Sequence, residues 1–231
     1  MTASKLRIAI LGSGPTGLEA ALAAADAGYA FTVYEGAAQV ASHVRDWGHI
    51  RLFTSWDLNV SARIRQALEE AGESVPEGTE YPTGAELVEK VLDPVSALSA
   101  LSGHIKYGVR VERLGRTGLL KHEEIGTGER GRHAFRLLLR DDSGREWTEE
   151  ADVVIDCTGN TEPNALGDGG IPAPGEGRAS EAISHEIPDV PGNPETWAGR
   201  TVLVVGAGHS ATTAVVDLVE LAEKHPGTEV V

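Results

Sequence analysis

Cysteine is nearly absent from this sequence: its 231 residues contain one, Cys157. A single thiol excludes an internal disulfide, a C-x-x-C redox pair and a cysteine-based metal cluster within these residues. None of the eight histidines shows an H-x-x-x-H or similar metal spacing, so we expect no metal site. Cys157 ends an apolar segment, and we interpret it as a packing residue rather than a nucleophile.

Basic residues and long apolar runs are also scarce. Lys and Arg total 20 against 35 Asp and Glu, which gives a formal net charge of −15. An acidic surface repels nucleic acid and anionic membranes, so we expect neither as a partner. The N-terminal segment is too short for a signal-peptide core, and no stretch approaches membrane-spanning length. The composition therefore favours a cytoplasmic protein.

Glycine, by contrast, is abundant, and three of the 28 glycines form a motif near the N-terminus. An apolar run over 8–11 ends in Gly12, Gly14 and Gly17 at the G-x-G-x-x-G spacing, and a helical pattern over about 15–27 follows. In such a strand–loop–helix unit the first glycine permits a tight turn, the second lets a pyrophosphate approach the backbone, and the third lets helix and strand pack closely. The first N–H groups of the helix then face the anion.

The position of one carboxylate strengthens this interpretation. A second apolar run, 30–34, follows the helix and leads into Glu35, 18 residues after Gly17. A dinucleotide fold places there the acid that accepts hydrogen bonds from a ribose hydroxyl. The alternative is a strand–helix–strand unit without a ligand. Because the glycines and the acid occur together, we favour a dinucleotide site.

Residues 42–59 combine aromatic and ionisable side chains without helix or strand periodicity. They include two of the four tryptophans, two histidines, two arginines and two aspartates. Loops of this composition often line ligand sites. Since the segment comes soon after Glu35, we expect it to run along the cofactor. A surface loop with some buried aromatics is the alternative.

The middle of the chain predicts helices. Residues 61–71 form a short helix in this interpretation. Thr83 and Glu86 make a capping box that opens an amphipathic helix. We expect Asp93-Pro94 to kink or break that helix, because proline cannot continue the hydrogen-bond ladder.

Short strands are expected next. Alternating segments between about 104 and 147 predict a small antiparallel β insertion, with a turn at 142–144. A further strand over 151–157 ends in Thr158-Gly159, where a small-residue turn brings the backbone close to a neighbour or ligand. Residues 160–197 are rich in Gly and Pro and lack periodicity, which is typical of a linker.

The glycine motif returns near the C-terminus. A buried-strand run over 201–205 leads into Gly206, Gly208 and Ala211, the G-x-G-x-x-A variant, and a helical stretch follows. Two such loops predict two dinucleotide sites. The next strand begins at 228 and the sequence stops at 231, so we expect the chain to be a fragment or a truncated product.

In this order, the elements resemble flavoprotein oxidoreductases with two dinucleotide-binding domains, FAD first and NAD(P)H second. Within them the chain looks most like the flavin-containing (class B type) monooxygenases and their FAD/NAD(P)-binding relatives. The resemblance implies an α/β fold, with a Rossmann-like FAD-binding domain over 1–160 that carries the antiparallel β insertion. A linker over 161–197 and the first half of a second Rossmann-like, NAD(P)-binding domain over 198–231 follow.

The same resemblance implies roles for the matching residues. It places Glu35 at the adenosine ribose, the backbone of Val109 at the adenine, and Ser210 as an additional phosphate donor in the second loop. No catalytic residue is implied. The polar residues expected beside the flavin ring are Thr54, Ser55 and Asn59. The expected cofactor-binding residues are Gly12, Gly14, Pro15, Thr16, Gly17, Glu35, Val109, Thr158, Gly159, Gly206, Gly208, Ser210 and Ala211.

The implied activity is that of an FAD- and NADPH- (or NADH-) dependent oxidoreductase, a flavin monooxygenase. It would transfer hydride from NAD(P)H to FAD and activate O2, acting on a small-molecule substrate. Pyridine nucleotide–disulfide reductases share both loops but need a redox dithiol, which Cys157 alone does not supply. The remaining hypothesis is a truncated FAD- or nucleotide-binding fragment without turnover of its own.

Overall fold

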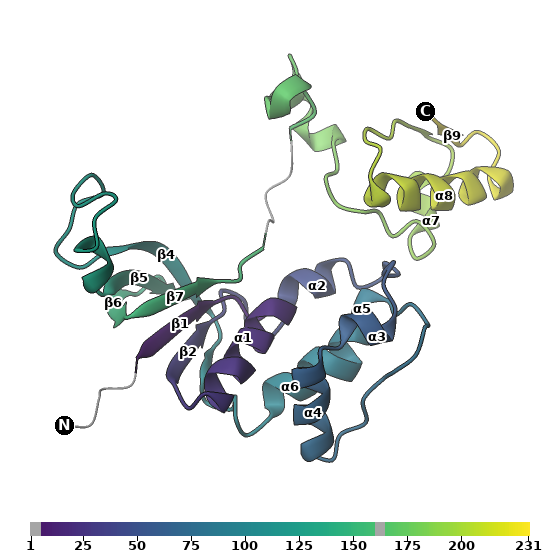
Figure 1. Ribbon diagram of the computed structural model, residues 1–231. Coiled ribbons are helices and arrows are strands. Elements are labelled where there is room, and N and C mark those ends of the chain that lie inside the picture. Colours follow the sequence, from purple (N-terminus) through teal and green to yellow (C-terminus); the bar gives the residue numbers. More distant parts are fainter. Residues whose placement is uncertain (1–5, 160–164) are drawn as a thin grey trace, which may run out of the picture. The chain divides into compact units, whose positions relative to one another are not determined.

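The computed structural model describes residues 6–159 and 165–231 (Figure 1). The chain divides between residues 161 and 162 into two compact units, and each is described by itself. The domain boundary expected between 160 and 161, and the first residues of the expected linker, lie outside the described residues.

A four-stranded parallel sheet forms the centre of the first unit, in the order β3-β2-β1-β7. Its strands are β1 (Arg7–Leu11), β2 (Ala30–Tyr34), β3 (Ile105–Lys106) and β7 (Val153–Asp156). The register places Ile8 of β1 opposite both Phe31 and Val153. Near-continuous apolar runs are typical of parallel strands that are covered on both faces, and the sheet is covered in this way.

The two faces of this sheet pack into two different cores. Ile10 and Val33 belong to a core shared with helix α1 (Pro15–Asp26) and with helices further along the chain. Leu11 belongs to a second core with Leu137 of the antiparallel sheet. Alternate residues of a strand point to opposite faces, so one short strand supplies both cores. The predicted α/β fold class is confirmed.

Short helices follow β2 where the sequence showed no periodicity. They are α2 (Ser42–Asp46) and α3 (Trp56–Asn59), and the longer α4 (Ala62–Glu70) follows where a helix over 61–71 was predicted. The expectation that 42–59 lacks regular structure is therefore wrong in part. Segments of five and four residues are about one helical turn, too short for a 3.6-residue period to repeat.

The predicted capping box is confirmed. Thr83 Oγ1 accepts a hydrogen bond from the Glu86 N–H at 3.2 Å, and the Glu86 carboxylate accepts one from the Thr83 N–H at 2.9 Å. The helix runs as α5 (Gly84–Leu87), a π-helical turn (Val88–Leu92) and α6 (Asp93–Ala97). The interruption expected at Pro94 is thus a widened turn, because a wider turn relieves the clash between the proline ring and the preceding carbonyls.

The antiparallel β insertion is also confirmed, with different bounds. It consists of β4 (Val109–Arg116), β5 (Phe135–Asp141) and β6 (Glu146–Ala151). The insertion does not begin at 104, because β3 pairs in parallel with β2 instead. Gly108, with a φ of 66°, turns the chain between β3 and β4, and this left-handed conformation suits glycine.

Glu149 of β6 joins the two sheets of the first unit. Its carboxylate accepts hydrogen bonds from Tyr34 Oη at 2.7 Å, from Lys106 Nζ at 2.9 Å and from Trp147 Nε1 at 3.0 Å. Burial acts to raise the pKa of Glu149, but the three donors outweigh it and the net pKa lies below its usual value. Burial and the hydrogen bond to Glu149 raise the pKa of Tyr34.

We expect Glu149→Gln to lower the free energy of unfolding by about 1–2 kcal/mol near pH 7, because three donors lose a charged acceptor. A depressed folded-state pKa stabilises the protein above the unfolded-state pKa of glutamate, and this contribution is lost as pH falls through the folded-state pKa. Urea unfolding at several pH values between about 3 and 7 measures this contribution to the free energy of unfolding. Wild type and variant should converge in stability at acidic pH, whereas the exposed neighbour control Glu150→Gln should match wild type throughout. Parallel curves for Glu149→Gln and wild type would contradict the assignment.

The second unit contains the second glycine loop. Its helices and strands are α7 (Pro194–Trp197), β8 (Thr201–Val202), α8 (His209–Lys224) and β9 (Glu229–Val230), after three 3₁₀ turns at Asp168–Gly170, Glu176–Arg178 and Ser180–Ala182. Val190, Leu218 and Leu221 form its core. The strand predicted over 201–205 keeps only its first two residues, which pair in parallel with β9, and Leu203 and Val205 are exposed.

Candidate functional site

The loop after β1 has the geometry that its three glycines predict. Gly12 adopts a φ of 92°, and a Cβ there would lie 2.9 Å from the carbonyl oxygen of Cys157. A Cβ on Gly17 would lie 2.0 Å from the carbonyl oxygen of Gly12, so only glycine lets α1 pack this closely. A Cβ on Gly14 would meet nothing within 4 Å. The backbone at Gly14 is therefore open to a ligand, as a pyrophosphate loop requires.

Helix α1 begins without a polar cap. Gly14 occupies the N-cap position, Pro15 follows it, and the first turn contains no acidic residue. The hydrogen bond from Leu18 N to Gly14 O, at 3.0 Å, is an early bond of the helix, so the N–H groups of Thr16 and Gly17 lie outside the helical ladder. These N–H groups and the positive end of the helix dipole suit phosphate oxygens.

Glu35 lies beside this loop at the end of β2 and is only 9% exposed. Its carboxylate accepts hydrogen bonds from the Ser13 N–H at 2.8 Å, from Ser13 Oγ at 2.6 Å and from the Ala37 N–H at 2.9 Å. A carboxylate offers about four acceptor positions. Three are thus used to orient Glu35, which leaves room for one further donor such as a ribose hydroxyl.

Ser13 is fully buried and was not among the residues predicted to serve the site. The available signal was a hydroxyl residue between the first two glycines of the motif. Its burial and its contact with Glu35 arise only when β1 and β2 lie side by side. Ser13 positions the carboxylate of Glu35 rather than facing the open side of the loop.

Two other predicted residues lie at the same carboxyl edge of the sheet. The Val109 N–H donates to the Glu35 carbonyl at 2.9 Å, so β4 starts beside the end of β2. Thr158 follows β7, and its Cα would lie 3.4 Å from a Cβ on Gly12. Gly159, with a φ of 72°, comes next. Open α/β sheets bind ligands outside the carboxyl ends of their strands, and these residues gather there.

The polar residues expected beside a flavin ring make contacts within their own turn. Thr54 Oγ1 lies 2.7 Å from Asn59 Oδ1, and Asn59 Nδ2 donates to the Thr54 carbonyl at 2.8 Å. Ser55 is the N-cap of α3, with no side-chain capping bond. Their described hydrogen bonds do not reach the glycine loop, so their place at a flavin stays a prediction.

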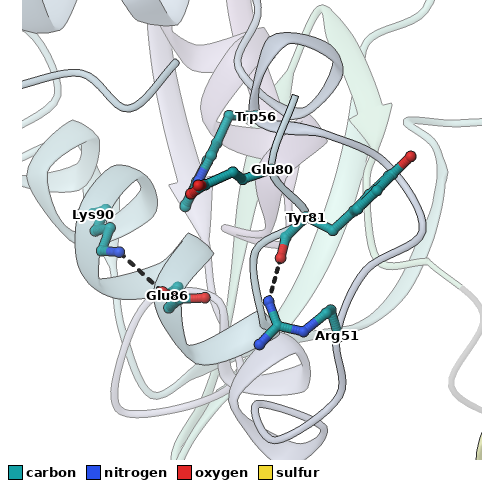
Figure 2. A pocket seen from close by; sticks show the side chains of 6 residues that line it. All are labelled: Arg51, Trp56, Glu80, Tyr81, Glu86 and Lys90. Carbon is teal, nitrogen blue, oxygen red and sulfur yellow. Dashed lines mark hydrogen bonds and ion pairs between the residues drawn. The ribbon is translucent and has the colours of Figure 1, made fainter. Parts of the chain in front are cut away.

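A surface pocket of about 350 Å³ opens beside this turn (Figure 2). It is lined by Arg51, Trp56, Glu80, Tyr81, Glu86 and Lys90. Part of its charge is already paired, because Lys90 Nζ lies 3.0 Å from Glu86 and Arg51 donates to the Tyr81 carbonyl. The ammonium of Lys90 lies 5.6 Å from the ring centroid of Trp56. The pocket thus combines an aromatic wall with groups of both charges.

The second glycine loop resembles the first, but its glycines are less closely packed against neighbouring atoms. Gly206 has a φ of 139°, and a Cβ on it would lie 3.6 Å from the Cβ of Ala211, an ordinary contact. The third position of this motif is alanine, whereas a Cβ at the third position of the first motif, Gly17, would clash with Gly12. Gly208 is the N-cap of α8, with no side-chain cap and no acidic residue in the first turn, and Ser210 lies in that turn. This helix start offers a second place for an anion.

Cys157 packs beneath the first loop. Burial, assisted by the neighbouring Asp156 carboxylate, raises the pKa of its thiol, so little reactive thiolate exists at neutral pH. Within residues 6–159 and 165–231, no three His, Cys, Asp or Glu side chains gather to hold a metal ion. Over the same ranges, no helix has both the length and the apolar character needed to cross a membrane.

No protein-family model matches the chain, and a search of curated proteins gives no match. Solved structures match it in fold. The bacillithiol disulfide reductase Bdr (YpdA) from Bacillus cereus superposes with a TM-score of 0.68 at 21% identity, covering 98% of this chain and 57% of that one. FAD-bound DfoA, a cadaverine monooxygenase from Erwinia amylovora, gives 0.66 at 15% identity, with 99% and 51% covered. OTEMO in complex with FAD and NADP gives 0.59 at 16% identity, with 97% and 38% covered.

The fold is thus similar to that of FAD/NAD(P)-binding flavoprotein oxidoreductases, as the glycine loops and the β insertion predicted. Flavin monooxygenases are among these similar structures. This chain covers 57% of the Bdr chain, 51% of the DfoA chain and 38% of the OTEMO chain.

Proposed function

We propose that the chain binds FAD at the first glycine loop and NAD(P)H at the second, as part of an FAD-dependent oxidoreductase. The observation that carries the proposal is the first loop, where a glycine-only contact at Gly17, an open backbone at Gly14 and an oriented Glu35 carboxylate occur together. The similar structures of DfoA and OTEMO contain FAD, and OTEMO also contains NADP, which supports the same pair of cofactors here.

The residues present fit a dinucleotide. The N-terminus of α1 would hold the pyrophosphate, Glu35 the ribose, and the backbone of Val109 the adenine, while the second loop would hold the pyrophosphate of NAD(P)H. Bound FAD supplies the redox chemistry, and the protein supplies binding, orientation and the exclusion of water. No proton-transferring side chain of this chain is required for that role.

Within this class we propose a monooxygenase that acts on a small-molecule substrate. The single cysteine favours it over a dithiol-dependent reductase, because these residues supply no redox pair. The pocket lined by Arg51 and Trp56 is the proposed place for the substrate, since it lies beside the turn of Thr54 and Asn59. The second candidate is nucleotide binding without turnover by these 231 residues, which the partial coverage of the similar structures favours.

The first test is a visible absorption spectrum of the purified chain, before and after anaerobic addition of NADPH or NADH. We expect a flavin band after purification or after reconstitution with FAD. Bleaching by either nucleotide would support hydride transfer between the two sites. A flavin band that persists would support FAD binding and favour the second candidate. A chain that takes up no FAD after reconstitution would overturn the proposal.

A further inference from the structure

Arg110 is an exposed residue of β4. Its neighbours Val109 and Val111 pack against the core between the two sheets, so Arg110 lies on the opposite face of the strand. Its cross-strand partner is Arg140, and like charges directly opposite destabilise a sheet. Arg140 is neutralised by an ion pair with Glu112. Arg110, in contrast, forms no ion pair with any residue that the structure describes.

The guanidinium of Arg110 lies against Gly36, the residue directly after Glu35. A Cβ on Gly36 would lie 3.2 Å from Cζ and 3.2 Å from Nη2 of Arg110. Such contacts are tighter than those that side chains normally make, so the absence of a side chain at Gly36 creates the place for the guanidinium. Arg110 is thereby held at the edge of the dinucleotide site, beside the carboxylate expected to bind the ribose.

The groups around the Arg110 guanidinium favour contact with one particular part of a dinucleotide. The Glu35 carboxylate next to it would repel a phosphate on the ribose, so a phosphate is a poor ligand for Arg110 there. A guanidinium is planar and weakly hydrated, and it stacks on aromatic faces. The aromatic group attached to the adenosine ribose is the adenine. The start of β4 at Val109, which carries Arg110 as the next residue, already lies at the end of β2.

We infer that Arg110 binds the adenine ring of the dinucleotide held by the first loop, with its guanidinium stacked on the base. The inference rests on the proposed function, since it needs FAD in the first site. It explains why the strand keeps two opposed arginines of which only Arg140 is neutralised. A local arrangement that costs stability is expected where function requires it.

The test is titration of the flavin-free 231-residue chain with FAD, followed by flavin fluorescence. We compare wild type with Arg110→Ala, Arg110→Lys and Arg113→Ala. Arg113 is the matched control, because it is an exposed arginine of the same strand whose side chain bonds to the Glu112 carbonyl. We expect Arg110→Ala to weaken FAD binding about tenfold, Arg110→Lys to weaken it nearly as much, and Arg113→Ala to leave it unchanged. Thermal unfolding of Arg110→Ala should occur at or slightly above the temperature of wild type, because this variant loses the charge opposite Arg140. Arg110→Lys and Arg113→Ala should unfold at the wild-type temperature.

The outcomes separate the inference from the proposed function. If wild type binds FAD and Arg110→Ala binds it as tightly as Arg113→Ala does, the inference is overturned and the proposed function stands. If Arg110→Lys binds as tightly as wild type, Arg110 acts as a point charge and the stacking inference is overturned. If wild type takes up no FAD, the proposed function fails and the inference fails with it.

Discussion

Gly17→Ala is expected to disrupt the first loop and abolish FAD retention. A methyl group at this position would lie 2.0 Å from the backbone oxygen of Gly12, and backbone cannot swing away as a flexible side chain can. The helix must therefore move off the strand that it covers. Overpacking of this kind costs about 1–3 kcal/mol or more, so we expect the melting temperature to fall by about 5–10 °C. Circular dichroism on heating and the flavin absorbance of the purified chain measure the two effects.

Gly14→Ala is the matched control within the same loop. Gly14 has extended backbone, and a methyl group there would meet no protein atom within 4 Å, so we expect an unchanged melting temperature. FAD binding should still weaken, because the methyl group would occupy the side of the loop that the pyrophosphate approaches. A Gly14→Ala variant that binds FAD like wild type would contradict a pyrophosphate at this loop. An unchanged melting temperature for Gly17→Ala would contradict the close packing.

Glu35→Gln is expected to destabilise the protein even without a cofactor. The wild-type carboxylate receives the N–H and hydroxyl of Ser13 and the N–H of Ala37. The NH2 group of glutamine would meet at least one of these donors in place of an acceptor. A buried donor left unpaired costs about 1–3 kcal/mol, so the midpoint of chemical unfolding should fall clearly.

FAD affinity of Glu35→Gln should fall as well, by about tenfold or more, because a ribose hydroxyl loses a charged acceptor. Ser13→Ala is the companion variant: it removes one donor to Glu35 but keeps the Ser13 N–H and the carboxylate. We expect it to cost less stability and less affinity than Glu35→Gln. Unchanged FAD binding by Glu35→Gln would refute the role of this residue at the ribose.

Features that depend on local pattern could be predicted from the sequence. The strand, loop and helix around Gly12 and Gly17 follow from apolar runs and glycine spacing, and the capping box at Thr83 follows from residues three apart. Features that depend on packing could not be predicted. Ser13 is buried only because β2 brings Glu35 next to it. The predicted start of the β insertion, near 104, was wrong because β3 pairs with β2 in the parallel sheet.

The pocket illustrates the same limit. Its lining comes from two stretches, Arg51 to Trp56 and Glu80 to Lys90, that are joined by an isolated bridge between Arg51 and Thr83. No spacing rule connects such stretches, because the contact is made by backbone pairing across 32 positions of sequence. The aromatic and ionisable character of 42–59 predicted a ligand site, which stays a prediction, and it could not predict that residues from Glu80 to Lys90 form the other wall of this pocket.

The division of β1 between two cores bears on how the first unit can fluctuate. Ile10 packs with the helices while its neighbours Ala9 and Leu11 pack with the antiparallel sheet. If either the helices or the antiparallel sheet separated from the parallel sheet, apolar residues of β1 would be exposed. Because β1 is part of both cores, partial opening of one core would also weaken the packing of the other. Local opening that involves only loops therefore has the lower free-energy cost. The backbone beneath the glycine loop is accordingly a rigid part of the first unit, against which the proposed nucleotide would bind.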